Sequence, residues 1–277
     1  MLTFGLITDV QYADADPNGE RHYRASVEKL KTAADALAGK KLPFTLHLGD
    51  FIDRDFTAFD AVLPLITRFS HPVYHLLGNH DYSVTDGEKS LVAAKLGMSR
   101  DYYSFTKSGV RFVMIDTNDH SVYKYPKDSP QTVEAEAYLK QLAEQHANNA
   151  KAWNGGVAGA QLAWLDQELS AADAAKEPVI LCGHHPLIPA GGMQAWGSSV
   201  LLAMIDKHPS IVAYFNGHEH AGAEVIRDGI PFITFKSVLH EPDKNSWSVI
   251  HLFKDKLEIE GYGREQSRVI PLRPIPV

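Results

Sequence analysis

Five short polar clusters recur along the chain, and each follows an apolar run that is typical of a buried strand. In chain order they are Asp9-Val10-Gln11, Gly49-Asp50-Phe51-Ile52-Asp53, Gly78-Asn79-His80-Asp81, Gly183-His184-His185 and Gly217-His218-Glu219-His220. The carboxyl ends of the strands in an open α/β sheet converge on one ligand crevice, so we expect the clusters to form a single site. Four of them begin with glycine, which permits a tight turn and a close backbone approach to a ligand.

The side chains in these clusters are carboxylates, carboxamides and imidazoles, which are oxygen and nitrogen donors. This donor set suits Mn²⁺, Fe or Zn²⁺ and exceeds what one tetrahedral ion needs, so we predict two divalent metal ions. A pair of ions roughly 3.5–4 Å apart with a hydroxide between them is a common means of displacing a leaving group from phosphorus. Cys182 is the single cysteine, which excludes an intrachain disulfide and a thiolate metal cluster.

Each cluster also has an ordinary structural interpretation when it is taken alone. Asp9-Val10-Gln11 is a common strand end, Gly49-Asp50 is a common turn, and Asn79-His80-Asp81 resembles an ordinary polar loop. The close pair His218 and His220 favours a metal even by itself. The ordinary interpretations would have to coincide in strand after strand, so a shared metal site is the better explanation.

The pattern between the clusters predicts an α/β (α+β) fold. Strands are expected at residues 2–8, 44–48 and 73–77, with helical periodicity at 23–37 and 59–69, which gives the order β-α-β-α-β. Further along we expect a hairpin at 102–115, helices near 134–146, 162–169 and 198–207, strands at 178–182 and 211–215, and hairpins turning at 228–229 and 254–255. No repeat, linker or charge block divides the chain, so we predict that residues 1–277 form a single domain with two sheets and helices outside. The proline-spaced tail at 271–277 is expected to run extended over the surface.

Composition narrows the class of protein further. The chain has 277 residues with 44% hydrophobic content, which is enough for a large core and excludes disorder. Its 27 basic and 34 acidic residues give a net charge of −7, which argues against nucleic acid or an anionic membrane as a partner. No segment resembles a secretory signal or approaches the roughly 20 apolar residues that span a bilayer. We therefore expect a cytoplasmic protein, whose oligomeric state the sequence leaves open.

The ordered series D-x-Q, G-D-x-x-D, G-N-H-D, G-H-H-P and G-H-x-H, over residues 9–220, resembles the calcineurin-like metallophosphoesterases. The resemblance implies a four-layer sandwich of two mixed β-sheets flanked by helices. It implies that one metal ion is held by Asp9, Gln11, Asp50 and His220, and the other by Asp50, Asn79, His184 and His218. It also implies that His80 is the catalytic histidine beside the phosphate.

Two acidic residues near these ligands have roles that the sequence leaves less defined. Asp81 is expected to act with His80 by orienting it, although a carboxylate that closes the loop is an equal alternative. Asp53 is expected to contact a ligand histidine rather than a metal ion.

A narrower resemblance covers nearly the whole chain. Gln11 stands where most members of the superfamily have histidine, and it is accompanied by Tyr12-Ala13-Asp14, Tyr23-Arg24, Trp153-Asn154-Gly155-Gly156, Gln161-Leu162-x-Trp164-Leu165, Gly261-Tyr262-Gly263-Arg264 and Ser267-Arg268. These residues resemble the manganese-dependent ADP-ribose/CDP-alcohol diphosphatase family. The resemblance implies a small phosphorylated substrate, whose phosphoanhydride is attacked by a metal-bridging hydroxide. The segment after Asp14 and the loop after Pro186 depart from that family, which leaves the preferred nucleoside open.

The residues that would bind the far end of the substrate are less clearly marked. The candidates are Asn154, Arg24, Tyr23, Asn118 and Trp196, and Asn154 ranks first because two glycines follow it. A second functional hypothesis is a cyclic-nucleotide phosphodiesterase or a broad-specificity phosphomonoesterase or phosphodiesterase with the same site. A third is a non-catalytic scaffold, which the presence of all seven candidate ligands opposes.

Overall fold

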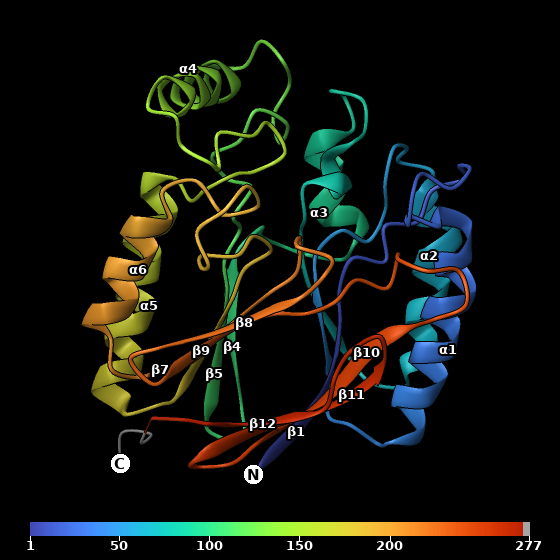
Figure 1. The fold of residues 1–277 in the computed structure, drawn as a ribbon, viewed down its shortest axis with the longest axis vertical. Helices are drawn as coiled ribbons and strands as arrows, with labels where there is room; N and C mark the ends of the chain where they lie inside the picture. Colours follow the sequence, from blue (N-terminus) through green and yellow to red (C-terminus); the bar gives the residue numbers. More distant parts are fainter. Residues whose placement is uncertain (274–277) are drawn as a thin grey trace.

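The computed structural model describes residues 1–273 and contains two six-stranded sheets that face each other (Figure 1). The first sheet has the order β12-β11-β10-β1-β2-β3. Its strands are β1 (Leu2–Ile7), β2 (Thr45–Leu48), β3 (Val73–Leu76), β10 (Ser246–Leu252), β11 (Lys256–Gly263) and β12 (Arg268–Pro271). The neighbours β1, β2 and β3 are parallel, and the pairs from β1 through β10 and β11 to β12 are antiparallel.

The second sheet has the order β4-β5-β6-β7-β9-β8. Its strands are β4 (Tyr103–Lys107), β5 (Val110–Met114), β6 (Val179–Cys182), β7 (Ile211–Asn216), β8 (Ala223–Arg227) and β9 (Ile230–Thr234). The pairs β5·β6, β6·β7 and β7·β9 are parallel, while β4 and β8 pair antiparallel at the two edges. Both sheets are therefore mixed.

Helices cover the outer faces of both sheets. On one side lie α1 (Ser26–Gly39) and α2 (Ala58–Ile66), and on the other lie α5 (Gly159–Ala175) and α6 (Ser198–Lys207), as Figure 1 shows. The short α3 (Val92–Lys95) and the longer α4 (Pro130–Glu144) lie beyond the sheets at one end of the molecule. The described part of the chain also contains four short 3₁₀ helices, at Tyr23–Ala25, Thr67–Phe69, His80–Tyr82 and Lys89–Leu91. The four-layer sandwich predicted from the sequence is confirmed.

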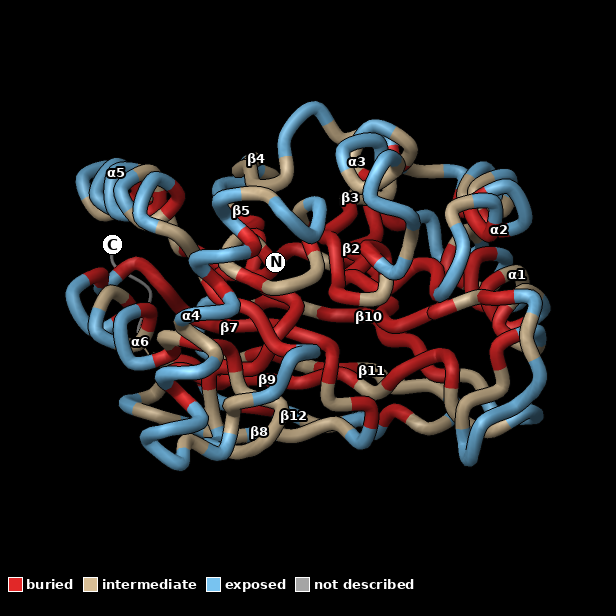
Figure 2. The backbone as a smooth tube through the Cα atoms, turned by 90° about the horizontal axis from the view of Figure 1, so that it is seen from above, coloured by how far each residue is buried: buried red, intermediate tan, exposed pale blue. Residues whose placement is uncertain are grey.

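The core between the sheets is built from alternate residues of the central strands. In β1, Leu2, Phe4 and Leu6 point toward the other sheet, because successive side chains of a strand alternate between its two faces. Phe4 meets Phe112 of β5 edge to face, with the ring centroids 5.3 Å apart. Figure 2 shows this buried interior in red between helices whose outer faces are exposed. Fully burying one such side chain stabilises the fold by about 1.5–3 kcal/mol.

The helix periodicities explain how the outer layers attach. In α1, Leu30, Ala33, Ala34 and Leu37 are fully buried against the first sheet. This spacing of three and four residues produces one apolar face of a helix. In α5, Leu165, Leu169 and Ala172 form the corresponding face against the second sheet. No helix among residues 1–273 is both long and apolar enough to cross a membrane.

Several elements differ in their bounds from the sequence expectation. The helix expected near 134–146 begins at Pro130, because the Ser129 hydroxyl accepts a hydrogen bond from the Thr132 amide at 3.2 Å and caps it. Arg268–Pro271 pairs with β11 as β12, a strand that the sequence analysis did not expect and that includes the first residue of the expected tail. Leu272 and Arg273 continue it with backbone hydrogen bonds to Asp255 and Gly229, and the last four residues of the expected tail, 274–277, lie outside the described residues. Strand β3 and the hairpin β4–β5 end or begin within about two residues of their expected positions.

Candidate metal centre

The loops that follow β1, β2 and β7 hold several of the predicted ligands in an uncommon backbone conformation. Asp9, Gln11, Asp50 and His218 have φ values of 51°, 50°, 57° and 67°. For residues other than glycine this left-handed region costs roughly 1–2 kcal/mol each, and such residues concentrate at functional sites. The Asp9 amide donates to the Gly49 carbonyl at 3.0 Å and the Gln11 amide to the Asp50 carbonyl at 2.8 Å, so the two loops hold each other in place.

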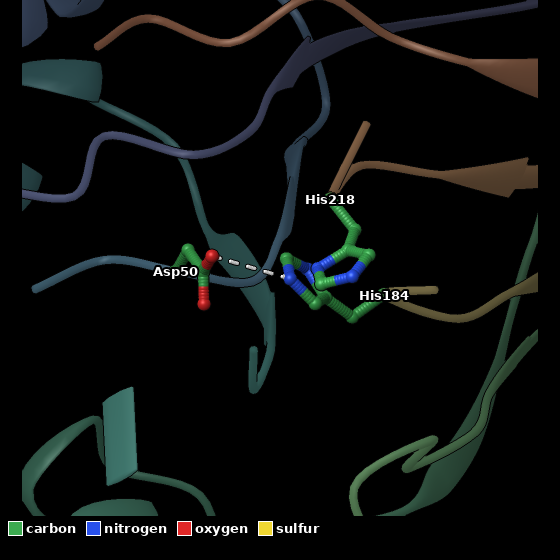
Figure 3. Close-up of side chains that lie close together, drawn as sticks. All are labelled: Asp50, His184 and His218. Atoms are coloured by element: carbon green, nitrogen blue, oxygen red, sulfur yellow. Dashed lines mark ion pairs between the residues drawn. The ribbon is translucent and has the colours of Figure 1, made fainter. Parts of the chain in front are cut away.

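Two groups of buried donor atoms meet at these strand ends and share one carboxylate. Asp50, His184 and His218 form the first group, which Figure 3 shows, and Asp9, Asp50 and His220 form the second. Within each group the donor atoms lie within 4.8 Å of one another. Asp50 Oδ2 is 3.3 Å from His184 Nε2, and Asp9 Oδ1 is 3.4 Å from His220 Nε2. Each group can hold a divalent ion, with Asp50 placed to bridge the two.

Two amide side chains, Asn79 and Gln11, lie beside the donor groups. Asn79 Oδ1 lies 3.0 Å from His218 Nδ1, which places this amide beside the first donor group. Among the predicted ligands, Gln11 Oε1, Asp50 Oδ2 and His184 Nε2 are buried and make no hydrogen bond within the described part of the chain, and the last two face each other at 3.3 Å. Buried polar atoms are normally paired, so this cluster of orphaned acceptors and imidazole nitrogens fits bound cations.

Each of the three imidazoles in these groups has its other nitrogen held by the protein. His184 Nδ1 donates to the Leu48 carbonyl at 2.8 Å. His220 Nδ1 is 2.9 Å from His240 Nε2, and His218 Nε2 is 3.0 Å from Asn154 Oδ1. Such contacts fix the orientation and the tautomer of a metal-binding histidine. The remaining nitrogen is Nε2 in His184 and His220, where it faces Asp50 and Asp9, and Nδ1 in His218, where it contacts Asn79.

The protonation of the central groups follows from their burial and their neighbours. Burial opposes the charged form of Asp50, but the facing rings of His184 and His80 outweigh it and lower the pKa of this carboxyl. Burial, together with the neighbouring His185, lowers the pKa of His218 well below its ordinary value. Asp50 is therefore an anion and His218 a neutral ring near pH 7, which are the forms that bind a metal ion.

His80 stands at the edge of this centre with a carboxylate behind it. Its backbone amide donates to Asp50 Oδ1 at 2.8 Å, and its Nδ1 lies 3.0 Å from Asp53 Oδ1. Burial lowers the pKa of His80, but the Asp50 and Asp53 carboxylates outweigh it, so the pKa is raised. Asp53 also accepts a hydrogen bond from Gln11 Nε2 at 3.3 Å, which leaves Gln11 Oε1 buried and without a hydrogen bond within the described part of the chain. Asp53 thus contacts His80 and Gln11, not a histidine of the two donor groups as the sequence analysis expected.

Asp81 does not orient His80. Its fully buried carboxylate accepts hydrogen bonds from the backbone amides of Asp50, Phe51, Ile52 and Gly78 at 2.8–3.1 Å. These bonds tie the loop after β3 to the loop after β2. The interpretation of Asp81 as a catalytic partner is corrected in favour of the loop-closing alternative.

A cavity of about 340 Å³ opens directly onto the donor groups. It is lined by Arg21, Asn79, His80, Trp153, Met193, His218 and His220. Trp153 is 48% exposed and gives the cavity an aromatic wall. The Asn154 amide donates to the Gly192 carbonyl at 2.8 Å, which joins the loops that carry Trp153 and Met193.

The structure places the predicted substrate residues away from this cavity's lining. Asn154 is fully buried behind His218, so it positions a donor group instead of facing a ligand. Arg24 is exposed, and its guanidinium binds Asp14 and Asp16. Tyr23 is buried beneath the guanidinium of Arg54.

The last two candidates are also occupied by internal contacts. The fully buried Asn118 amide donates to the Leu77 carbonyl at 2.7 Å and accepts from the Tyr123 hydroxyl at 2.8 Å. Trp196 is 1% exposed, and its indole donates to the Asn149 carbonyl at 3.0 Å. Both side chains fix loops near the centre, and neither has a free polar atom for a substrate.

Four residues around the centre were missed in the sequence analysis: Arg21, Met193, His240 and, as a lining residue, Trp153. Trp153 had a local signal, because it directly precedes Asn154, which the sequence analysis ranked first among the candidates for substrate binding. The others reach the centre through contacts between segments far apart in the sequence, for which no local pattern exists.

The fold and the paired donor groups are those of a metal-dependent phosphohydrolase. The chain belongs to the calcineurin-like phosphoesterase family, whose model matches residues 2–222. It is 31% identical to a manganese-dependent ADP-ribose/CDP-alcohol diphosphatase from Oryza sativa subsp. japonica, over 94% of this chain and 91% of that protein. It is 27% identical to the human protein of the same name, over 98% of this chain and 92% of that protein.

A solved structure agrees with the family assignment. The crystal structure of a dimetal phosphatase from Danio rerio matches with a TM-score of 0.87 and 27% identity, covering 98% of this chain and 99% of that chain. The protein is thus an enzyme that depends on divalent metal ions, and the manganese in its relatives' names agrees with the oxygen and nitrogen donors found here.

Proposed function

We propose that this enzyme hydrolyses the phosphoanhydride of nucleoside diphosphate derivatives such as ADP-ribose and CDP-alcohols. One ion would be held by Asp9, Gln11, Asp50 and His220, and the other by Asp50, Asn79, His184 and His218. The observation that carries the proposal is that two buried donor groups share Asp50 at the floor of one cavity. Relatives named for this activity, at 27–31% identity over nearly the whole chain, support the choice of substrate class.

When bound, two divalent ions supply an activated water and positive charge for the phosphate oxygens. The chain's own residues position the reaction. His80 Nδ1 is engaged by Asp53, so its Nε2 is the ring nitrogen available to the substrate. Because carboxylates raise the pKa of His80, the ring carries more positive charge near neutral pH than an ordinary histidine, and it can offset charge on the departing oxygen.

The cavity favours a small molecule over a macromolecular partner. A volume of about 340 Å³ lies at the small end of the range that ligand pockets occupy, roughly 300–1,000 Å³. Trp153 offers an aromatic face on which a nucleobase can stack. Loops from both sheets contribute lining residues, so we also propose that residues 1–277 act as a single domain.

A substrate panel with added Mn²⁺ tests the proposal. We expect kcat/KM for ADP-ribose or CDP-choline to exceed that for cyclic AMP and for a simple aryl phosphate by at least about tenfold. The variant Asp50→Asn, which removes charge from the shared carboxylate, should lose hydrolysis of every substrate. If cyclic AMP or the aryl phosphate were the better substrate by a wide margin, the enzyme would be a phosphodiesterase or a phosphomonoesterase, and the diphosphatase proposal would be wrong.

A further inference from the structure

His185 is a fully buried histidine that belongs to neither donor group, yet its ring lies against two of the candidate ligands. Its ring centroid is 4.2 Å from that of His218 and 5.1 Å from that of His184. Its backbone is fixed, because the Tyr214 hydroxyl donates to the His185 carbonyl at 2.7 Å and the His185 amide donates to the Thr117 hydroxyl oxygen at 3.1 Å. A polar ring buried in this way needs hydrogen-bond partners for its nitrogens.

The proton on the His185 ring can be located from the contacts of Thr117. The Thr117 hydroxyl oxygen accepts hydrogen bonds from the backbone amides of His184 at 3.2 Å and His185 at 3.1 Å, which occupy its two lone pairs. Its own hydroxyl proton is therefore left to donate to His185 Nδ1, 2.7 Å away. Because Nδ1 accepts this hydrogen bond, the ring is neutral and carries its proton on Nε2.

The Nε2–H group of His185 faces the loop that forms one wall of the cavity. Nε2 lies 3.3 Å from the Trp153 carbonyl oxygen and 3.5 Å from the Tyr123 hydroxyl, so the carbonyl is the nearer acceptor. The side chain of Trp153 is 48% exposed and lines the cavity beside the donor groups. His185 therefore binds the backbone of the residue whose ring faces the ligand.

The next residue of this loop is attached to the centre by separate contacts. The Asn154 side chain contacts His218 at 3.0 Å through Oδ1 and donates to the Gly192 carbonyl at 2.8 Å through Nδ2. Among residues 1–273, no hydrogen bond other than that from His185 engages the backbone of Trp153. Loss of the His185 contact should therefore release residue 153 while residue 154 stays in place.

We propose that His185 is a positioning residue, whose Nε2–H holds the Trp153 backbone so that the Trp153 ring forms a fixed stacking wall for the nucleobase. This inference rests on the proposed function, since only a nucleotide substrate offers a base to stack on the ring. His185 contacts neither the substrate nor the ions, so its loss should weaken nucleotide binding more than it slows the chemical step. The net contribution of one neutral hydrogen bond predicts a rise in KM for ADP-ribose of about three- to tenfold, with kcat within about twofold of the wild-type value.

A double-mutant cycle tests whether His185 acts through the Trp153 ring. With ADP-ribose and Mn²⁺, His185→Leu should raise KM about three- to tenfold, and His185→Gln, which keeps an N–H donor, should recover part of the loss. In the Trp153→Ala background, His185→Leu should change KM by less than about twofold, because the ring that it positions is absent. His251→Leu is the matched control, since His251 Nδ1 also contacts a threonine hydroxyl, that of Thr3, and it should retain the wild-type KM.

Hydrogen–deuterium exchange followed by mass spectrometry measures the same contact without any substrate. We expect the backbone amides of residues 151–156 to exchange at least about threefold faster in His185→Leu than in the wild type, and at the wild-type rate in His251→Leu. Mn²⁺ affinity, measured by titration calorimetry, should stay within about threefold of the wild-type value in both variants.

Three results would overturn the inference. The first is an unchanged exchange rate of residues 151–156 in His185→Leu. The second is a KM for ADP-ribose that is unchanged in His185→Leu, or that rises equally with and without the Trp153 ring. The third is a fall in kcat and in Mn²⁺ affinity at constant KM, since His185 would then support the ligands instead of the wall. If the wild type did not hydrolyse ADP-ribose, the proposed function would be wrong on its own account, and the exchange rates would still decide whether His185 holds the loop.

Discussion

The hydrogen bond between His240 and His220 gives the most specific prediction about how the centre is supported. His240 Nε2 lies 2.9 Å from His220 Nδ1, and His240 Nδ1 lies 3.3 Å from a carboxylate oxygen of Glu20. This chain of contacts orients His220 so that its Nε2 faces Asp9. The variant His240→Ala removes the orienting contact and leaves the candidate ligand itself in place.

The expected magnitude follows from the geometry. Loss of an outer partner of a metal-binding histidine typically costs about 10- to 100-fold in metal affinity, which corresponds to about 1.4–2.7 kcal/mol. The His240 side chain is 16% exposed, so water can replace part of the lost contact, and we expect a weakening near the lower end, about tenfold. Glu20 is 78% exposed, so Glu20→Gln should weaken binding by less than about threefold.

Titration calorimetry of Mn²⁺ into metal-free protein measures this effect. We expect one of two binding events to weaken in His240→Ala and the other to change little. His251→Ala serves as a control, because His251 lies in β10 and contacts Thr3 and Glu260 instead of the centre. The reasoning is refuted if His240→Ala binds both ions with wild-type affinity, or if His251→Ala weakens binding to the same degree.

Three further predictions concern packing and pH. Gly78→Ala should abolish Mn²⁺ binding in the same titration, because the added Cβ would lie 2.5 Å from the backbone nitrogen of Asp50. Gly87→Ala is the control and should bind Mn²⁺ normally, because a Cβ at Gly87 would have no atom within 4 Å. Burial lowers the pKa of His75 to about 4, so below about pH 6.5 the unfolded chain binds more protons than the folded protein. The free energy of unfolding should therefore fall as the pH drops from about 6.5 toward 4, by at most about 1.4 kcal/mol per pH unit from this group. Denaturant titrations should show a smaller fall in His75→Leu than in the wild type. Trp196→Ala should lower the free energy of unfolding by about 3–5 kcal/mol in denaturant titrations, because Trp196 is buried. Trp153→Ala should instead raise KM for ADP-ribose with little loss of stability, because Trp153 is half exposed and lines the cavity. The reverse pattern would contradict these positions.

The convergence of the five clusters could be predicted from the sequence because its causes are local. Apolar runs mark the buried strands, and a glycine followed by a polar residue marks the strand end. Once β1, β2 and β3 are parallel, their carboxyl ends must meet at one edge, which brings Asp9, Asp50 and Asn79 together. Strand periodicity also determined which residues enter the core between the sheets.

The residues around the cavity could not be predicted in the same way. Arg21 and Arg24 lie in one short segment, and only the bridge from Arg21 to His240 and the acidic partners of Arg24 decide which of them faces the cavity. Asp81 follows His80 in sequence, but its carboxylate accepts hydrogen bonds from the backbone amides of the loop after β2 and therefore does not contact His80. Trp196 is a large aromatic residue of the kind that can stack on a substrate, but its indole is buried and donates a hydrogen bond to the Asn149 carbonyl. In each case a contact between distant segments decides the role.

The number of Mn²⁺ ions bound per chain tests the central claim most directly. Equilibrium dialysis followed by elemental analysis, on wild-type protein and on Asp50→Asn, gives that number without reference to any substrate. Because two donor groups share Asp50, we predict two ions per wild-type chain and fewer than two in the variant at the same free Mn²⁺ concentration. One ion or none in the wild type, or two ions retained by Asp50→Asn with wild-type affinity, would contradict a dinuclear centre built around Asp50.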